Sequence, residues 1–249
     1  MSHETYYYGQ GKVYLAKRGT DGKPGAWRWI GDVSALQVAM TVESFSHKES
    51  YSGQRAEVRR LITSKEASVT STWHDHSPEN LALVLYGQSA TVAAGTVTGE
   101  ALPASIKAGE RYSLEHQNVS DVVIDALVEG TDYTVDPEFG AITFLTVQNK
   151  ALSVNYKYGA STITSVFDQN PEEVAFRFEG LNLAENEQKV ILELYKLKFD
   201  PTSALSLINT DTSLGGLETT AAALADTQRK ESDALYGRYG RLVTVGSAA

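Results

Sequence analysis

The densest group of side chains that could bind a metal ion is His74-Asp75-His76. Imidazole and carboxylate groups are common zinc ligands, but a site needs three or four of them converging on one point. Neighbouring residues of an extended chain point in opposite directions, and no His-x-x-x-His pair or second cluster supplements these three. The pattern favours a polar turn that leads into a helix at Ser77, and we expect no metal site.

Motifs for nucleotide binding or nucleophilic catalysis are incomplete. Gly9-Gln-Gly11 begins like a dinucleotide fingerprint, but Tyr14 stands where the third glycine is required. The sequence has neither a phosphate-binding Walker lysine pattern nor a Gly-x-Ser-x-Gly elbow. Any pair chosen among the 31 acidic residues would be arbitrary. We therefore expect no enzymatic activity and no cofactor.

Composition and charge limit the classes of protein that need to be considered. The chain has 249 residues, a formal net charge of −9 and no cysteine, so disulfide and thiol chemistry are excluded. Its pI near 5.1 argues against a surface that grips nucleic acid, because phosphate binding needs clustered Lys and Arg. The longest apolar run, residues 81–86, is far shorter than the roughly 20 residues of a membrane-spanning helix. The amino terminus does not resemble a signal peptide, and a reducing cytoplasm is expected for assembly.

A period of two dominates the chain and predicts β-strands. Alternate residues from Leu36 to Val42 are apolar and their neighbours are mostly polar, and residues 66–73 repeat this pattern. These two segments are expected to form an antiparallel pair with one buried and one wet face. Two further hairpins are predicted, one from residues 12–16 and 27–30 and one from residues 174–179 and 190–199.

Helical signals are few. Ser77 is expected to cap a short helix, Pro78 suits its first position, and Gly87 could end it in the left-handed conformation. A second short helix or turn is expected over residues 201–208, and residues 217–228 favour neither period. The predicted fold is thus mainly β, with one short flanking α-helix.

Residues 95–165 have the pattern of an inserted, β-rich lobe. Runs of β-branched and aromatic residues at 122–128, 133–144 and 152–158 are separated by Gly, Asp and Pro, which predicts a small meander. The segment has a net charge of −5, more than half that of the chain. We expect it to form a peripheral lobe, with residues 1–94 and 166–249 making the main β domain.

A 17-residue polar segment, Ser44–Arg60, separates the two long strands, where an ordinary hairpin would use about 2–5 residues. Its net charge is +2 in an acidic chain, which favours docking on another copy of the chain. We expect this loop to be flexible in the monomer. The residues predicted to make the contact are Lys48, Glu49, Tyr51, Arg55, Glu57, Arg59 and Arg60.

The order of these elements resembles the tail tube, or major tail, proteins of long-tailed bacteriophages. The resemblance rests on the strand Gly11-Lys-Val-Tyr-Leu15, the strand–loop–strand unit of 33–73, the helix from Ser77, the segment 130–144 and the late run Leu194–Pro201. It implies a β-sandwich or barrel tube fold and homohexameric rings that stack into a hollow tube for genome ejection. It also implies a tail terminator, a tape-measure protein and tail-tip proteins as partners, and a place in the virion tail. In that family the loop that corresponds to 44–60 reaches the neighbouring ring.

In such a tube, the polar faces of the two long strands would line the channel. Small hydroxyl and acidic side chains there would let DNA pass without specific binding. The residues predicted to line the lumen are Gln37, Thr41, Glu43, Glu66, Ser68, Thr70 and Thr72. Two alternatives remain: the tube of a phage-derived bacteriocin or injection machine, and a β-sandwich adhesin or carbohydrate-binding module. The latter would use aromatic residues such as Trp27, Trp29 and Tyr51, while Tyr6-Tyr7-Tyr8 could be either a sugar platform or an interface patch.

Overall fold

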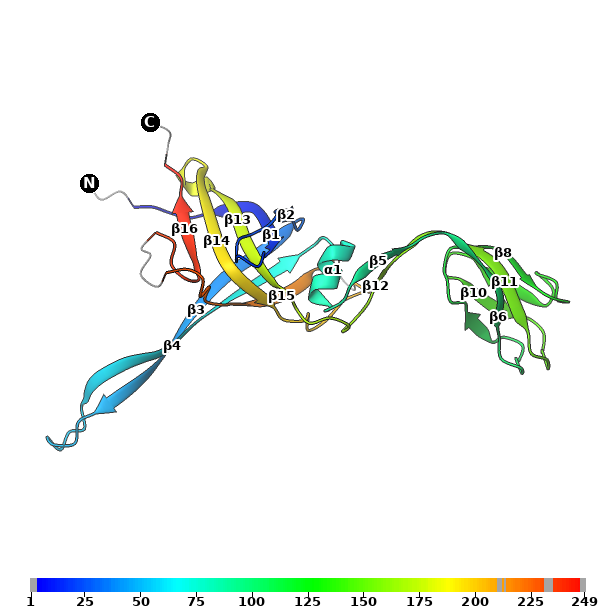
Figure 1. Cartoon of the computed structure of the whole chain (residues 1–249), viewed down its shortest axis with the longest axis horizontal. Helices are drawn as coiled ribbons and strands as arrows, with labels where there is room; N and C mark the ends of the chain where they lie inside the picture. Colours follow the sequence, from blue (N-terminus) through cyan, green and yellow to red (C-terminus); the bar gives the residue numbers. More distant parts are fainter. Residues whose placement is uncertain (1–3, 210–211, 213, 231–234, 247–249) are drawn as a thin grey trace. The chain divides into compact units, whose positions relative to one another are not determined.

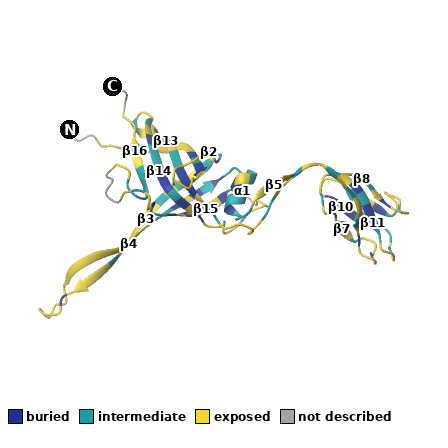
Figure 2. Ribbon diagram, in the orientation of Figure 1, coloured by how far each residue is buried: buried dark blue, intermediate teal, exposed yellow. Residues whose placement is uncertain are grey.

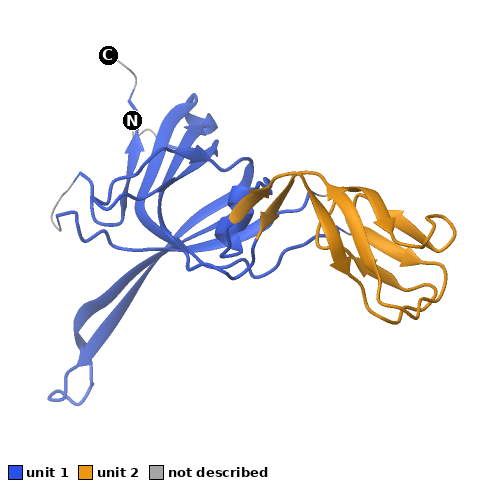
Figure 3. Cartoon of the chain, turned by 45° about the vertical axis from the view of Figure 1, so that its right-hand side comes forward, with its two compact units in different colours: residues 1–88, 165–249 blue, residues 89–164 orange. Residues whose placement is uncertain are grey.

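The computed structural model describes residues 4–209, 212, 214–230 and 235–246. The fold is mainly β, as predicted, with antiparallel strand pairs and one short α-helix (Figure 1). The chain divides into two compact units. Unit 1 comprises residues 1–88 and 165–249, and unit 2 comprises Ser89–Thr164 (Figure 3).

Unit 1 is built on one eight-stranded antiparallel sheet. The strand order is β2-β1-β13-β14-β15-β4-β3, and β16 pairs with β14 beside this path. The strands are β1 (Gly9–Lys17), β2 (Arg28–Trp29), β3 (Val33–Lys48), β4 (Glu57–Trp73), β13 (Glu173–Asn182), β14 (Gln188–Phe199), β15 (Leu217–Ala223) and β16 (Gly240–Thr244). Both further predicted hairpins are present, since β1 pairs with β2 and β13 pairs with β14.

One face of this sheet carries the core of unit 1. Val69 and Trp73 of β4 are buried, and the Trp73 ring meets Phe199 of β14 edge to face, with ring centroids 5.4 Å apart. Leu36 and Val38 of β3 are half-buried against the same cluster. Burying alternate side chains in this way is what a period of two requires, and Figure 2 shows the buried residues gathered within the broad part of the sheet.

The helix α1 (Pro78–Val84) lies where the sequence predicted it, but its ends differ from the prediction. Ser77 precedes the helix without making a side-chain cap hydrogen bond, and the Asp75 carboxylate instead accepts a hydrogen bond from Ser77 N at 3.1 Å. The left-handed residue after the helix is Tyr86, with φ of 52°, and not Gly87. A Cβ on Gly87 would lie 1.7 Å from Ser165 O, so glycine is needed there for a close backbone approach.

Two other expectations for unit 1 need revision. Residues 201–208 form no helix, because an isolated segment of that length gains too little from its own hydrogen bonds without an apolar face to bury. Residues 217–223, which the sequence left open, form strand β15 between β14 and β4. Its buried positions alternate strictly with exposed ones.

Unit 2 has its own strands and its own core. Its strands are β5 (Ser89–Val92), β6 (Gly95–Ala101), β7 (Arg111–Ser113), β8 (Val119–Ile124), β9 (Tyr133–Asp136), β10 (Ala141–Phe144), β11 (Ser153–Tyr158) and β12 (Ser161–Thr164). They form two three-stranded sheets, β7-β10-β9 and β6-β11-β8, and the pair β12-β5. The sequence predicted one meander over 95–165. The three apolar runs divide between two sheets, because side chains from both sheets meet in a single core that includes Ile142, Phe144 and Tyr156.

The segment 44–60 is not a loop of 17 residues, contrary to the prediction. Strands β3 and β4 pair along it from Ser44↔Ile62 to Lys48↔Glu57, and only residues 49–56 lie outside strands. Polar side chains lie on both faces of this segment, so its sequence does not show the alternation that indicates a strand. The backbone hydrogen bonds between the two strands form regardless of side-chain polarity. The result is a two-stranded arm that projects from the sheet of unit 1 (Figure 1).

Candidate assembly surfaces

The arm, defined as residues 40–65 of β3, β4 and their connecting tip, exposes apolar side chains that continue the core face of the sheet. Leu36 and Val38 pack on the core, but the next residues on that face, Met40 and Val42, lie beyond it, and Met40 is 81% exposed. The prediction that all four are buried is therefore wrong for Met40 and Val42 in the single chain. Ile62, opposite Ser44, extends the same face and is 61% exposed.

A β-bulge gives the arm a second apolar face. Glu43 pairs with Ser64 and Ser44 pairs with Ile62, so Thr63 is the extra residue. Beyond the bulge, Phe45 pairs with Leu61, and both side chains are exposed. By the alternation of β3, Phe45 lies on the face of Glu43, opposite that of Met40 and Val42. An exposed strand pair with apolar groups on both faces has little to stabilise it alone, so this arm is suited to being enclosed by a partner.

The tip of the arm is organised by Glu49. Its carboxylate accepts hydrogen bonds from Tyr51 N and Ser52 N, both at 2.8 Å, from the Ser52 hydroxyl and from Ala56 N at 3.3 Å. These hydrogen bonds, first of all that of the Ser52 side chain, lower the pKa of Glu49 to about 2. Glu49 is buried and so does not present its charge to a neighbour, contrary to its predicted contact role. Tyr51, by contrast, is 86% exposed.

The arm keeps basic side chains available for a partner. Arg60 Nε donates to Ser44 Oγ at 2.8 Å, and Glu57 accepts from Ser46 Oγ at 2.8 Å. Among the described residues, the arm's predicted contact cations form no ion pair; these are Lys48, Arg55, Arg59 and Arg60. With Glu49 held inside the tip, the cations of the arm outnumber its exposed carboxylates, Glu43 and Glu57.

The residues predicted to line a lumen share one face of the sheet. Between the bulges the register is regular, with Ala35 opposite Thr72, Gln37 opposite Thr70 and Thr41 opposite Glu66. This face is the reverse of the one that buries Val69. The seven side chains brought together on it are Gln37, Thr41, Glu43, Glu66, Ser68, Thr70 and Thr72.

Strand β15 enlarges this polar face with residues that the sequence reading missed. Thr220 pairs with Thr70, Glu218 with Thr72, and Ala222 with Ser68, so their side chains continue the same surface. The signal was present in the strict alternation of Leu217, Thr219, Ala221 and Ala223 with these three residues. A short strand rich in Ala and Thr is difficult to distinguish from a helix by composition, and pairing with β4 decides its conformation.

The His74-Asp75-His76 segment makes structural contacts. The two ring nitrogens of His74 lie 2.9 Å from Ser34 Oγ and 3.1 Å from Gly215 O, while Asp75 O accepts a hydrogen bond from the Asn80 amide at 2.9 Å. Across the described residues, no group of His, Cys, Asp or Glu side chains has the arrangement of a metal site. The segment is the polar turn into α1 that the sequence favoured.

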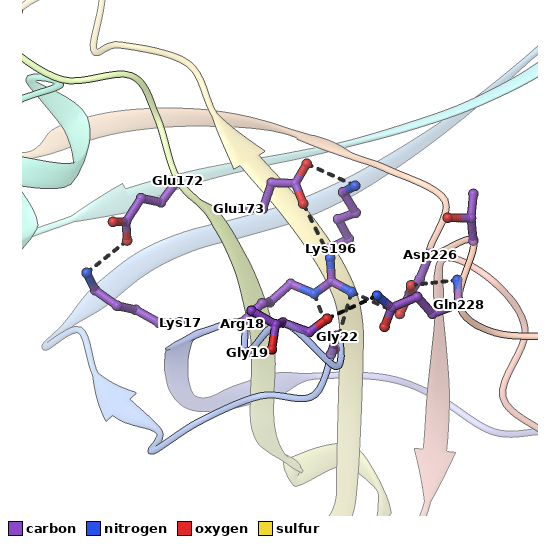
Figure 4. A pocket seen from close by; sticks show the side chains of 11 residues that line it. Lys17, Arg18, Gly19, Gly22, Glu172, Glu173, Lys196, Asp226 and Gln228 are labelled. Atoms are coloured by element: carbon purple, nitrogen blue, oxygen red, sulfur yellow. Dashed lines mark hydrogen bonds and ion pairs between the residues drawn. The ribbon is translucent and has the colours of Figure 1, made fainter.

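A surface hollow of about 510 Å³ lies beside β1, β13 and β14 (Figure 4). Its charged side chains are paired with one another. Lys17 lies 2.9 Å from Glu172, Lys196 lies 2.9 Å from Glu173, and Arg18 lies 3.1 Å from Asp226. These ion pairs link neighbouring segments of the chain. Because each of these cations already faces a carboxylate, they leave no unpaired charge that would mark a ligand site.

Together, the sheet, the inserted unit and the projecting arm define a mainly antiparallel β protein. The chain belongs to the family described as Protein of unknown function UCP028589, whose model matches residues 6–243. No curated protein matches the sequence. Within the described part of the chain, no helix combines the length and apolar character needed to cross a membrane.

Proposed function

We propose that this protein is the structural subunit of a phage tail tube, forming stacked hexameric rings around a channel through which DNA is delivered to the host. It acts by assembly and without catalysis. Its partners are other copies of itself, together with the terminator, tape-measure and tail-tip proteins that complete such a tail. It is assembled in the host cytoplasm and resides in the virion.

The observation that supports this proposal best is the arm. Burying a side chain such as Met40, Val42 or Ile62 contributes about 1.5–3 kcal/mol, and the single chain leaves all three exposed. Their exposure is accounted for if another subunit covers them. The unpaired cations of the arm would meet the acidic surface of that subunit, which carries a net charge of −9 over the whole chain.

The polar face of β3, β4 and β15 supports the second half of the proposal. It combines small hydroxyl and methyl side chains with the carboxylates of Glu43, Glu66 and Glu218, and β14 adds Lys198 beside Ala222. A surface that is mostly neutral or negative repels phosphate or holds it weakly. DNA could therefore slide along it. The open edge of β3 would supply backbone groups for pairing within a ring.

Electron microscopy of the purified protein tests assembly directly. We expect regular hollow tubes above a critical concentration, and we expect none from a variant that combines Arg55→Glu, Arg59→Glu and Arg60→Glu. Circular dichroism of that variant should stay β-rich, because these side chains lie on the arm and away from either core. A matched control, Lys107→Glu with Lys150→Glu in unit 2, should still form tubes. A wild-type chain that remains monomeric at high concentration would refute the proposal.

DNA passage is tested at the polar face. Replacing Ser68 and Thr70 by Lys should allow tubes to form, because neither side chain belongs to the core of unit 1. A ring of cations would then hold phosphates and slow ejection. If correctly assembled particles eject DNA at the normal rate, these two positions do not line the channel. Tubes that form normally but are never associated with DNA in infected cells would instead favour a bacteriocin or injection machine.

A carbohydrate-binding module is the alternative from another class. Trp29 is exposed, with Lys12 Nζ 5.3 Å from the centre of its ring, and Trp27 is close by in the chain. Tyr51, however, lies at the tip of the arm and not beside β2, so the three predicted aromatics do not form one platform. Binding to sugars on a glycan array, by a chain that remains monomeric, would favour this alternative.

A further inference from the structure

A group of aromatic side chains is held in place near the amino terminus. Tyr6 N donates to Glu185 Oε1 and Tyr8 N donates to Asn182 Oδ1, both at 2.9 Å. Asn182 Nδ2 donates back to Tyr6 O at 2.8 Å, and Leu183 N donates to Tyr8 O at 2.8 Å. The main chain of this segment is therefore fixed to the turn between β13 and β14, although it belongs to no strand.

The side chains of this segment nevertheless face solvent. The three tyrosines are 61–64% exposed, and Leu181 near the end of β13 and Leu183 in the adjacent turn are exposed as well. We call one face of this segment the tyrosine patch, and it consists of Tyr6, Tyr8, Leu181 and Leu183. Tyr7 lies on the opposite side, because neighbouring residues of an extended chain alternate. An apolar surface whose backbone is already ordered loses little conformational entropy when a partner covers it. Tyrosine is also enriched at protein interfaces.

Carboxylates surround the tyrosine patch. Glu4 accepts a hydrogen bond from the Tyr6 hydroxyl at 2.6 Å, Glu185 lies within the 3₁₀ turn η1 (Leu183–Glu185), and Glu187 is exposed just after it. One base, Lys189, pairs with Leu181 across β13 and β14, so the carboxylates outnumber the bases beside the patch. The patch thus combines exposed apolar area with negative charge, whereas the arm combines exposed apolar area with positive charge.

We infer that the arm of one copy of this chain packs against the tyrosine patch of a second copy. Met40, Val42 and Ile62, or Phe45 and Leu61 on the reverse face, would cover the rings. The arm's arginines would approach Glu4 and Glu187. Because the two surfaces differ, the contact is heterologous: each copy can offer one arm and receive another, and the contact continues from copy to copy unless its rotation closes a ring. This inference rests on the proposed function and names the surface that receives the arm.

Unit 2 also carries carboxylates and exposed apolar residues, but it is a weaker candidate for the receiving surface. The arm and the tyrosine patch belong to one unit and are joined by one hydrogen-bonded sheet through β4, β15, β14 and β13. A repeating assembly needs its two contact surfaces at a fixed geometry, and shared strands provide that rigidity. Unit 2 is a separate compact unit with its own core.

Photo-crosslinking within assembled protein identifies the receiving surface. Phe45, an exposed residue of the proposed contact, would be replaced by p-benzoylphenylalanine, and ¹⁴N- and ¹⁵N-labelled chains would be mixed so that mass spectrometry recognises crosslinks between copies. We expect crosslinks between copies to residues 4–8 or 181–187. Crosslinks between copies that reach only other segments, including unit 2, would overturn the inference.

A charge exchange tests the same contact energetically. Glu4→Arg with Glu187→Arg leaves the Glu185 anchor in place and should raise the critical concentration for assembly about tenfold or more. Combining it with Arg55→Glu and Arg59→Glu should restore most of the loss. The matched control, Glu129→Arg with Glu138→Arg in unit 2, should leave the critical concentration unchanged.

The outcomes separate the two proposals. Tubes from the wild-type chain, with an unchanged critical concentration for Glu4→Arg with Glu187→Arg, would refute the tyrosine patch and leave the tube proposal standing. Impaired assembly that the added arm substitutions do not restore would also refute direct contact between the two surfaces. A wild-type chain that forms no tubes would overturn the proposed function, and this inference with it.

Discussion

Replacing Ile142 by alanine should unfold unit 2 more easily while leaving unit 1 nearly unaffected. Ile142 lies in the middle of β10, is 0% exposed, and pairs with Tyr112 of β7 and Val135 of β9. Its side chain lies in the core that the two three-stranded sheets of unit 2 share. Shortening it to a methyl group leaves a cavity within the core of unit 2.

The size of the effect follows from the size of the unit. A buried Ile→Ala change costs about 2–5 kcal/mol, whereas a unit of 76 residues is stabilised by only about 4–11 kcal/mol. A loss of about 3 kcal/mol should lower the melting temperature of unit 2 by roughly 12–24 °C. The matched change in unit 1 is Leu197→Ala, which is also 0% exposed. In a unit of 173 residues it should lower that unit's melting temperature by roughly 6–12 °C.

Differential scanning calorimetry, with urea unfolding followed by circular dichroism, measures both changes. We expect two transitions, with Ile142→Ala moving one and Leu197→Ala moving the other. Expression of Ser89–Thr164 alone should reproduce the transition assigned to unit 2. If both variants shift one shared transition by similar amounts, the units do not unfold independently and the reasoning is wrong.

Three further predictions concern single residues. The pKa of Glu49 is depressed to about 2 in the folded arm, so its stabilisation of the tip is present above its ordinary pKa and is lost as pH falls toward 2. Hydrogen exchange of the Tyr51 and Ser52 amides should show this loss, and Glu49→Gln should abolish the pH dependence. Asn80→Ala should cost about 1–3 kcal/mol in urea unfolding, because buried Asn80 accepts from Arg28 at 2.7 Å and donates to Ile30 O at 2.9 Å; exposed Gln88→Ala should cost nearly nothing. Gly87→Ala should cost roughly 1–3 kcal/mol by displacing Ser165, and Gly246→Ala, with open space around it, serves as its control.

Much of the fold could be predicted from the sequence because alternation reports burial directly. The strand around Val69 was predictable for that reason, since it buries Val69, Ser71 and Trp73 in alternation. The arm was mistaken for a loop because a strand pair outside the core has no burial pattern to reveal it. Pairing there depends on backbone hydrogen bonds, which a list of side chains does not display.

The candidate surfaces were predictable only in part. The shared face of Gln37 and Thr70 followed from the period of two, since the register between the bulges is regular. The role of Glu49 did not follow, because a carboxylate that binds its own tip amides has the same sequence signature as one that meets a partner. The tyrosine patch required knowledge that Asn182, far along the chain, fixes Tyr6 and Tyr8.

The position of unit 2 in the chain has a consequence for how such proteins diversify. Ser165 N donates to Gln88 O at 2.9 Å, so the chain leaves unit 1 and returns to it at adjacent points, and β5 and β12 continue side by side. A domain whose two ends are neighbours can be removed or exchanged without separating the residues it joins. The junction between residues 88 and 165 therefore serves as a natural insertion point, at which evolution or a protein engineer could place a different domain.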